Sequence, residues 1–417
     1  MRIWLVTIGE PWPNDTRKIR LLRTGVIASQ YSSRGDDVVW FNESFDHFTR
    51  HQKAKQRHRG LKAGRLEIVA LDGRGYRGAV SVTRMLHHVE VARDFRDRIG
   101  NFERPDVIVA SLTPLELCRE AVRYGKKNGI PVIVDVRDLW PEIWLQVLPR
   151  MARPLARMAF SPYFSMLKEI VDNSAALCGV SEEAVEWALG RGSRRRNPFD
   201  GALPLAYRPP DLSAPELAEA ENFWSSQGIE RDDGKLTICF FGNISHRVEL
   251  ETVIQAVESA PTVVLERVRL VFCGHGEADG KLRELARKFN MVRLPGWMNA
   301  AQIEVLKRRS NAGLLPYPSD LDFTRSIPNK FFDYLSGGLP VLTSLKGVTA
   351  QIIERESCGW IYENRDSEDF LKVVQMLLAD RGALTRAAAN ARSAGAQFAA
   401  EKIYGEFRNR LDAIVAA

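Results

Sequence analysis

The residues best suited to chemistry lie between Ser326 and Ser344, where a short loop leads into a helix, a pair of glycines and a strand. Ser326 or Asn329 can cap the start of this helix, whose first backbone N–H groups then face any bound anion. Such a helix start is a ready site for a diphosphate, and Lys330 adds a positive charge there. Asp333 lies one turn further on the same face, where a carboxylate can accept hydrogen bonds from two ribose hydroxyls. The pattern therefore predicts a site for a nucleoside diphosphate.

The same helix also has an apolar side, which offers a plainer interpretation. Phe331, Tyr334 and Leu335 recur at the spacing of one helical face, and we expect them to lie in a core. Gly338 suits a left-handed helix end. The alternative for the whole stretch is an ordinary helix–strand unit that binds nothing.

This stretch resembles the helix of the family 4 glycosyltransferases, which often reads K-x-x-E-Y-L-x-x-G-x-P-V. The matching positions are Lys330, Asp333, Tyr334, Leu335, Gly338, Pro340 and Val341. In that family this carboxylate binds the nucleotide ribose, so the resemblance implies the same role for Asp333. An earlier glutamate of the family touches the donor sugar, and Arg325 stands at that position here.

A glycine turn after the first strand of the second half extends the resemblance. Gly242 lets the backbone approach a phosphate, and Gly242 and Asn243 match the family's loop under the diphosphate. Arg247 is the nearest substitute for the basic residue of that loop. Trp297 resembles a residue beside the base, where it would stack on the base or plug the edge of the domain. The resemblance thus implies that Arg247 and Lys330 are catalytic, because they would stabilise the leaving diphosphate.

In the first half, Arg137 and Asp138 follow a buried strand, at the end of an open α/β sheet where ligands bind. The stretch that begins at Arg137 resembles the R-D-L-W-P-E sequence of family 4 members that build bacterial surface polysaccharides. Gly9 lies in a loop that resembles the family's acceptor loop, and we expect Asp46 and His47 to contact the acceptor. A structural ion-pair role for Arg137 and Asp138 remains the alternative.

Short apolar strands alternate with helix-length segments along most of the chain, which predicts doubly wound parallel sheets. With the resemblance, the expected fold is α/β of the GT-B type, in which two Rossmann-like domains face each other across a cleft. We expect an acceptor domain at 1–205 and a nucleotide-sugar domain at 206–399. The basic, proline-rich stretch that begins at Arg194 is the expected linker, and a last helix at 400–417 could pack back on the first domain.

The composition indicates the cellular compartment of the protein and the charge of its partners. The chain has 417 residues and a net charge of +7, and residues 1–200 hold 33 Lys and Arg against 24 Asp and Glu. That excess favours an anionic partner for the first half. Five scattered cysteines and no apolar run of about 18 residues indicate a cytoplasmic protein without a membrane span. The basic stretches at 50–59 and 148–167 leave contact with the inner face of an anionic membrane open, whereas no nucleic-acid motif is present.

The resemblance implies a retaining, metal-independent glycosyltransferase that needs no cofactor and takes a nucleotide sugar, by default linked to UDP, as donor. The acceptor would be a saccharide or a lipid-linked saccharide of a cell-surface polysaccharide pathway. Asp320 and Asp322 form a D-x-D pair, but they precede a helix start and are not expected to bind a metal. The alternatives are a nucleotide-sugar epimerase or hydrolase on the same fold, and a catalytically inactive nucleotide-sugar-binding protein.

Overall fold

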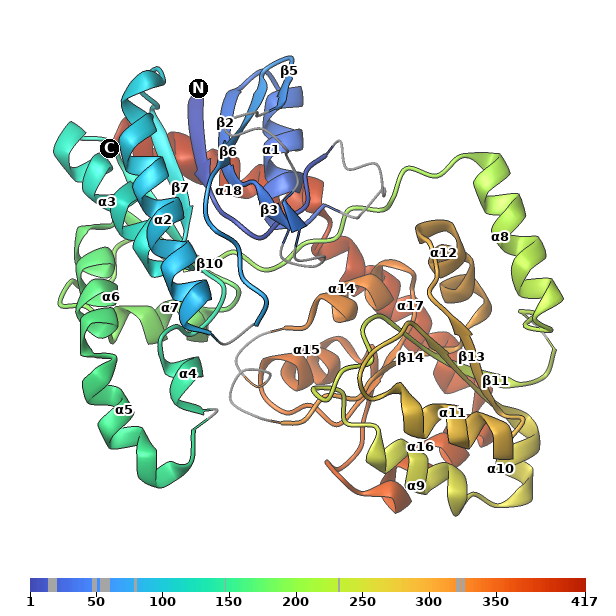
Figure 1. Cartoon of the computed structure of the whole chain (residues 1–417). Coiled ribbons are helices and arrows are strands. Elements are labelled where there is room, and N and C mark those ends of the chain that lie inside the picture. The colour runs from blue at the N-terminus through green and yellow to red at the C-terminus, as the bar shows by residue number, and fades with distance from the viewer. Residues whose placement is uncertain are drawn as a thin grey trace. The chain divides into compact units, whose positions relative to one another are not determined.

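The protein forms two compact units, seen in a computed structural model (Figure 1). The first unit is Met1–Pro204 with Ala400–Ala417, and the second is Leu205–Ala399. The described residues are 1–13, 21–46, 51–52, 61–78, 81–146, 148–231, 233–319, 324 and 327–417.

The first unit has a mixed α/β composition. Its strands are β1 (Arg2–Val6), β2 (Asp37–Glu43), β3 (Phe45–Asp46), β4 (His51–Gln52), β5 (Leu61–Ala63), β6 (Leu66–Leu71), β7 (Val107–Ser111), β8 (Val132–Val136), β9 (Ala176–Gly179) and β10 (Gly201–Ala202). Its helices are α1 (Arg23–Ser33), α2 (Val82–Arg98), α3 (Leu115–Asn128), α4 (Glu142–Gln146), α5 (Arg153–Ala159), α6 (Ser161–Asn173), α7 (Glu182–Leu189) and α18 (Ala400–Ala416), with short 3-10 turns η1 (Ile99–Asn101) and η2 (Arg150–Ala152).

The sheet of the first unit has the order β10-β9-β8-β7-β1-β2-β6-β5. All its strand pairs are parallel except β5 with β6. The central strands β7 and β8 are buried along their whole length because helices cover both faces. The strand order reverses between β1 and β7, and ligands of open α/β sheets bind outside such a reversal.

Helix α18 belongs to the first unit although it comes last in the sequence. The Tyr31 hydroxyl of α1 donates a hydrogen bond to the carbonyl of Tyr404, at 2.8 Å. The Arg408 guanidinium forms a two-pronged ion pair with Asp36, with both N–O distances at 2.7 Å. These contacts fix the helix on α1 and on the turn that follows α1.

The second unit repeats the α/β alternation. Its strands are β11 (Leu236–Phe241), β12 (Val268–Cys273), β13 (Val292–Gly296), β14 (Ala312–Leu315), β15 (Val341–Thr343) and β16 (Gly359–Ile361). Its helices are α8 (Ala214–Ser226), α9 (Glu251–Glu258), α10 (Thr262–Arg267), α11 (Asp279–Lys288), α12 (Ala300–Arg309), α14 (Asn329–Ser336), α15 (Val348–Glu356), α16 (Ser367–Ala379) and α17 (Arg381–Gln397).

The sheet of the second unit has the order β13-β12-β11-β14-β15-β16, and every pair is parallel. Strand β11 is buried at all six positions, which explains its uninterrupted apolar sequence. The strand order reverses between β11 and β14, so the turns after these strands flank the position where a ligand is expected. The predicted architecture of two doubly wound parallel sheets is confirmed.

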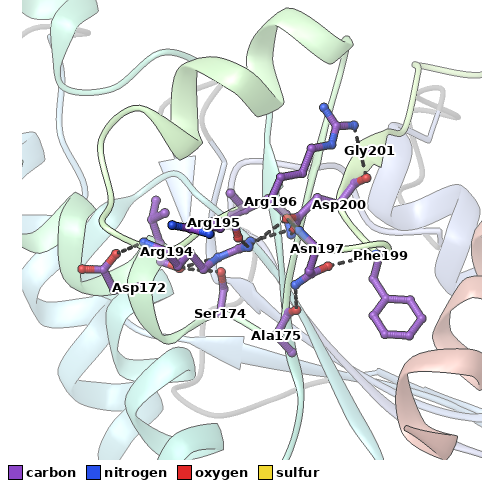
Figure 2. A network of polar contacts seen from close by, with 12 residues as sticks. Asp172, Ser174, Ala175, Arg194, Arg195, Arg196, Asn197, Phe199, Asp200 and Gly201 are labelled. Carbon is purple, nitrogen blue, oxygen red and sulfur yellow. Dashed lines mark hydrogen bonds and ion pairs between the residues drawn. The ribbon is translucent and has the colours of Figure 1, made fainter.

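The chain passes from the first unit to the second at Leu205, within the basic stretch expected to be a linker, and the part of that stretch from Arg194 to Pro204 is folded into the first unit (Figure 2). Arg194 forms a two-pronged ion pair with the buried Asp200, at 2.7 and 2.8 Å. Asp200 also accepts backbone N–H groups from Leu177 and Asn197, at 2.7 and 2.8 Å. The Asn197 side chain donates to the carbonyl of Ala175, at 2.9 Å. The network holds β10 beside β9.

Substitution of Asp200 tests this network. Burial alone would raise the pKa of Asp200, but the hydrogen bonds from Arg194 and from two backbone N–H groups lower it below its usual value. We expect Asp200→Asn to lower the free energy of unfolding by about 3 kcal/mol, because it leaves the partly buried Arg194 guanidinium without its buried carboxylate partner. Chemical denaturation at neutral pH measures this loss.

The pH dependence supplies a second readout. A lowered pKa means that the carboxylate stabilises the fold fully above about pH 4 and loses that effect as the pH falls through the lowered pKa. The difference between parent and variant should therefore shrink in acid. Asp97→Asn, in an exposed pair with Arg96, is the control and should change stability by less than about 1 kcal/mol. Equal effects of the two substitutions would contradict the assignment.

Candidate active site

Helix α14 begins at Asn329 behind Pro328, whose side chain provides no cap hydrogen bond. In the part of the chain that the structure describes, the Phe331 N–H of the first turn donates to the carbonyl of Pro328 at 2.9 Å, and no side-chain cap accepts from the N–H groups of Asn329 or Lys330. At the other end Gly338 has a φ of +66°, the left-handed conformation that glycine adopts without strain. The N–H of Gly338 donates to Leu335 and that of Leu339 to Tyr334, both at 2.9 Å, which is the pattern of a Schellman motif.

The apolar side of α14 fixes the helix to the sheet. Phe331, Tyr334 and Leu335 are fully buried, which confirms their predicted place in the core. The Tyr334 hydroxyl donates to the carbonyl of Leu314, at 2.9 Å. Its ring occupies the space that a side chain at Gly313 would need. Because Gly313 lies in β14, this packing sets the position of α14 relative to the strand.

Three turns at the carboxyl ends of β11, β12 and β13 lie against one another. The Gly242 N–H donates to the carbonyl of Cys273 at 2.8 Å, and the Gly274 N–H donates to that of Gly296 at 2.7 Å. A side chain at Gly274 would overlap the carbonyl of Gly242, and one at Gly276 would overlap that of Ile244. The result is a ledge in which the glycines allow the backbone of the three turns to pack closely together.

Lys330 extends across this ledge from the first turn of α14. A Cβ atom built on Gly242 would lie 2.5 Å from the Lys330 Cε and 2.8 Å from its Nζ, so the lysine covers the glycine. The ammonium donates to the Tyr317 hydroxyl at 2.8 Å and lies 5.1 Å from the centre of the Phe240 ring. Tyr317 follows β14 and Gly242 follows β11. Lys330 therefore lies at the reversal of strand order.

Asp333 lies one turn after Asn329 and is 9% exposed. Its backbone carbonyl accepts a hydrogen bond from the buried Lys307 ammonium at 3.4 Å. Lys307 also forms an ion pair with Glu304 at 2.5 Å and donates to the Tyr207 hydroxyl at 3.1 Å. Burial and the Glu304 carboxylate raise the pKa of Tyr207. This buried cluster packs against α14 at Asp333, the residue expected to bind the ribose.

The remaining donor-side candidates are more exposed. Asn243 is exposed, and its amide oxygen lies against Gly276 of the next turn. Arg247 is exposed too, and its backbone N–H donates to the Ser245 hydroxyl at 3.4 Å. Trp297 is 72% exposed after β13, so it is not a core residue of its unit.

Two residues named from the sequence, Ser326 and Arg325, lie outside the described residues, as does the D-x-D pair of Asp320 and Asp322. Within the described residues no group of three or more His, Cys, Asp or Glu side chains is arranged to hold a metal ion.

In the first unit, the position that corresponds to a phosphate site is filled by the protein itself. The buried Glu10 carboxylate accepts the backbone N–H groups of Thr24 and Gly25, at 3.0 and 3.1 Å, at the start of α1. Arg137 forms ion pairs with Glu10 and with Asp135, the latter at 2.7 Å. Burial would lower the pKa of Arg137, but these two carboxylates raise it. The structure thus shows Arg137 in the ion pairs that were one of its two expected roles, and contact of Arg137 with an acceptor stays a prediction.

The other acceptor candidates that the structure describes are Gly9, Asp46 and Asp138 of the first unit. Gly9 has a φ of +79° in the turn after β1. Asp46 is buried in β3, which pairs with β4 in an antiparallel ladder, while Asp138 is exposed. His47 lies outside the described residues.

Sequence reasoning missed three residues that shape these sites. Tyr317 stands between two prolines directly after a strand, and that position was the available signal. The contacts of Lys307 with Tyr207 and with the Asp333 carbonyl, and of Glu10 with Arg137, join residues distant in the sequence and so leave no local pattern.

The comparisons with known proteins concern the second unit and the fold. Residues 224–394 match the model of the family described as glycosyl transferases group 1. That range covers the glycine ledge and α14. The fold of the whole chain is GT-B, as the solved structures show.

Sucrose-phosphate synthase from Thermosynechococcus elongatus matches with a TM-score of 0.69 at 15% identity, over 99% of both chains. Anabaena HepE in complex with UDP-glucose matches with a TM-score of 0.64 at 12% identity, over 99% of this chain and 100% of that one. WaaG, a glycosyltransferase involved in lipopolysaccharide biosynthesis, matches with a TM-score of 0.62 at 16% identity, over 100% of both. No curated protein matches the chain by sequence.

The packing of Tyr334 on Gly313 yields a prediction about stability. Gly313→Ala should lower the free energy of unfolding by about 2 kcal/mol, because the added methyl group overlaps the Tyr334 ring and overpacks the core. The matched control is Gly280→Ala in α11, where an added Cβ meets no atom within 4 Å. That substitution should raise stability by about 0.5 kcal/mol, since alanine restricts the unfolded chain. Denaturant titrations of both variants check the opposite signs.

Proposed function

We propose that the protein is a glycosyltransferase that binds a nucleoside diphosphate sugar in its second unit and transfers the sugar to an acceptor. The observation that carries this proposal is the Lys330 ammonium, held over the bare backbone of Gly242 at the start of α14. A cation, a helix start and the glycine ledge together suit a diphosphate. The match of residues 224–394 to glycosyl transferases group 1 supports the same conclusion.

In the proposed reaction, the protein's main contribution is to stabilise the leaving diphosphate. The negative charge of the diphosphate would be stabilised by Lys330, Arg247 and the first N–H groups of α14. Electrostatic stabilisation by preorganised groups is usually the largest single contribution to catalysis. Gly242 and Asn243 would line the phosphates, and Asp333 would accept the ribose hydroxyls. Transfer would retain the anomeric configuration, with the leaving diphosphate taking the proton of the acceptor hydroxyl. Positioning of donor and acceptor supplies the rest.

The finer parts of the proposal concern the substrates and the setting. We propose a UDP-linked donor, no required metal or cofactor, and a saccharide or lipid-linked saccharide acceptor in cell-surface polysaccharide synthesis. The names of two matching structures, one with UDP-glucose and one from lipopolysaccharide biosynthesis, support these substrates by analogy of fold. A cytoplasmic setting is supported by the five cysteines, which are all buried and unpaired.

Binding of UDP tests the donor site. UDP should raise the melting temperature of the parent, since a ligand that binds only the folded protein stabilises it. Asp333→Ala should abolish that rise, and Lys330→Met should weaken UDP binding by about tenfold because one charge-assisted hydrogen bond is lost. Each rise is measured against the variant's own melting temperature without UDP. Lys281→Met, at a side chain 70% exposed on α11, is the matched control and should bind UDP like the parent.

Two results would contradict the proposed site. One is that Asp333→Ala binds UDP as tightly as the parent. The other is that Lys330→Met weakens uridine as strongly as UDP, since the ammonium is assigned to the phosphates and not to the nucleoside.

Turnover separates the proposed transfer from the other reactions of a nucleotide-sugar enzyme. With UDP-glucose alone, a transferase should release UDP slowly, and an added saccharide acceptor should speed the release and form a new glycoside. Chromatography of the sugar products measures both. Fast release of free glucose without acceptor would favour a hydrolase, and conversion to another UDP-hexose would favour an epimerase. Tight binding without any product would indicate an inactive binding protein.

A further inference from the structure

The segment from Arg150 to Ala159, formed by η2 and α5, has no buried residue. Met151 is 94% exposed, and Leu155 and Met158 are each 73% exposed. They follow one another at the i, i+4 and i+7 positions, so they share one face. Large apolar side chains on a protein surface are usually scattered singly, and a cluster of this kind marks an interaction site.

Exposure of this segment is part of how the first unit is built. Figure 1 shows α5 at the end of a projection that it forms with α4 and α6. An aromatic cluster anchors the base of the projection, in which Trp144 packs on Trp140, Phe160 and Tyr163 with ring centres 4.5 to 5.2 Å apart. The Tyr163 hydroxyl donates to Glu116 of α3, at 3.0 Å. The anchored base holds α5 away from the core.

The charges of the segment are all positive. Residues 143–167 contain three arginines and no Asp or Glu. Arg150, Arg153 and Arg157 share a second face, next to the apolar one. In the part of the chain that the structure describes, Arg150 and Arg157 form no ion pair, and the Arg157 guanidinium lies over the Phe164 ring at 5.0 Å. The surface therefore combines exposed methionine and leucine with unneutralised cations.

We propose that the segment 150–159 docks the first unit on a bilayer that contains anionic phospholipid. A short helix with one apolar and one basic face can lie in the plane of the interface, with its apolar side chains among the acyl chains and its arginines at the phosphates. A second copy of this chain is a poorer partner, because it would bring the same arginines together. Among the described helices, none has the length and hydropathy that a span across a bilayer requires.

Vesicle flotation tests the proposal with the full chain and without any nucleotide sugar, so it can fail independently of the proposed reaction. The parent should float with vesicles of phosphatidylglycerol and phosphatidylcholine, and bind vesicles of phosphatidylcholine alone at least about tenfold more weakly. The variant Met151→Ser/Leu155→Ser/Met158→Ser and the variant Arg150→Gln/Arg157→Gln should each weaken binding by about tenfold. Their melting temperatures should stay near that of the parent, because none of these residues is buried.

Matched control variants remove the same kinds of side chain, apolar and basic, from exposed positions in the second unit. Val263→Ser/Met376→Ser removes two exposed apolar side chains of the second unit, and Arg355→Gln/Arg386→Gln removes two exposed charges. Both should float like the parent. The proposal is overturned if the parent does not bind anionic vesicles, or if the segment variants bind as the controls do. It is also overturned if the apolar substitutions only dissolve a dimer of this chain in sedimentation and leave flotation unchanged.

Discussion

The close approach of Gly274 to the carbonyl of Gly242 is the constraint on which the candidate donor site depends. The two backbone segments can touch there only because Gly274 carries no side chain, whose Cβ would overlap the Gly242 carbonyl. The lack of a side chain at Gly242 likewise lets Lys330 extend across it to reach Tyr317. Helix α14 can present that lysine because Tyr334 holds it against the sheet. The position of the Lys330 ammonium is thus set by the packing of the glycine turns and of Tyr334.

The two units use one architecture in different ways. Each has a turn at the reversal of strand order, followed by a helix. In the first unit the Glu10 carboxylate occupies the start of α1, and Arg137 neutralises it. In the second unit the start of α14 has no side-chain cap, and the nearby charge is the Lys330 cation. An internal anion satisfies one helix start, while the other is left suited to an anion from solution.

The fold could be predicted because its signals are local. Strands such as Val107–Ser111 and Leu236–Phe241 are apolar at nearly every position, which predicts parallel strands covered on both faces, and the structure buries both strands at every position. The strands β5 and β10 escaped prediction, because two or three residues become a strand only through a neighbour. The same limit applies to the sites. Gly242 and Asp333 stand in readable motifs, whereas the pairing of Glu10 with residues more than 100 positions away depends on the folded chain.

The return of α18 to the first unit has a consequence for how the protein is made. The ribosome has synthesised the whole second unit once it reaches Ala399. At that point it has not yet synthesised α18, the helix that contributes Tyr404 and Arg408 to the first unit. The nascent amino-terminal part must therefore wait, with Asp36 and the Tyr31 hydroxyl lacking their final partners, while the whole of Leu205–Ala399 is translated and can already mature. The first unit, whose synthesis begins first, therefore receives its last helix only after the second unit has been synthesised.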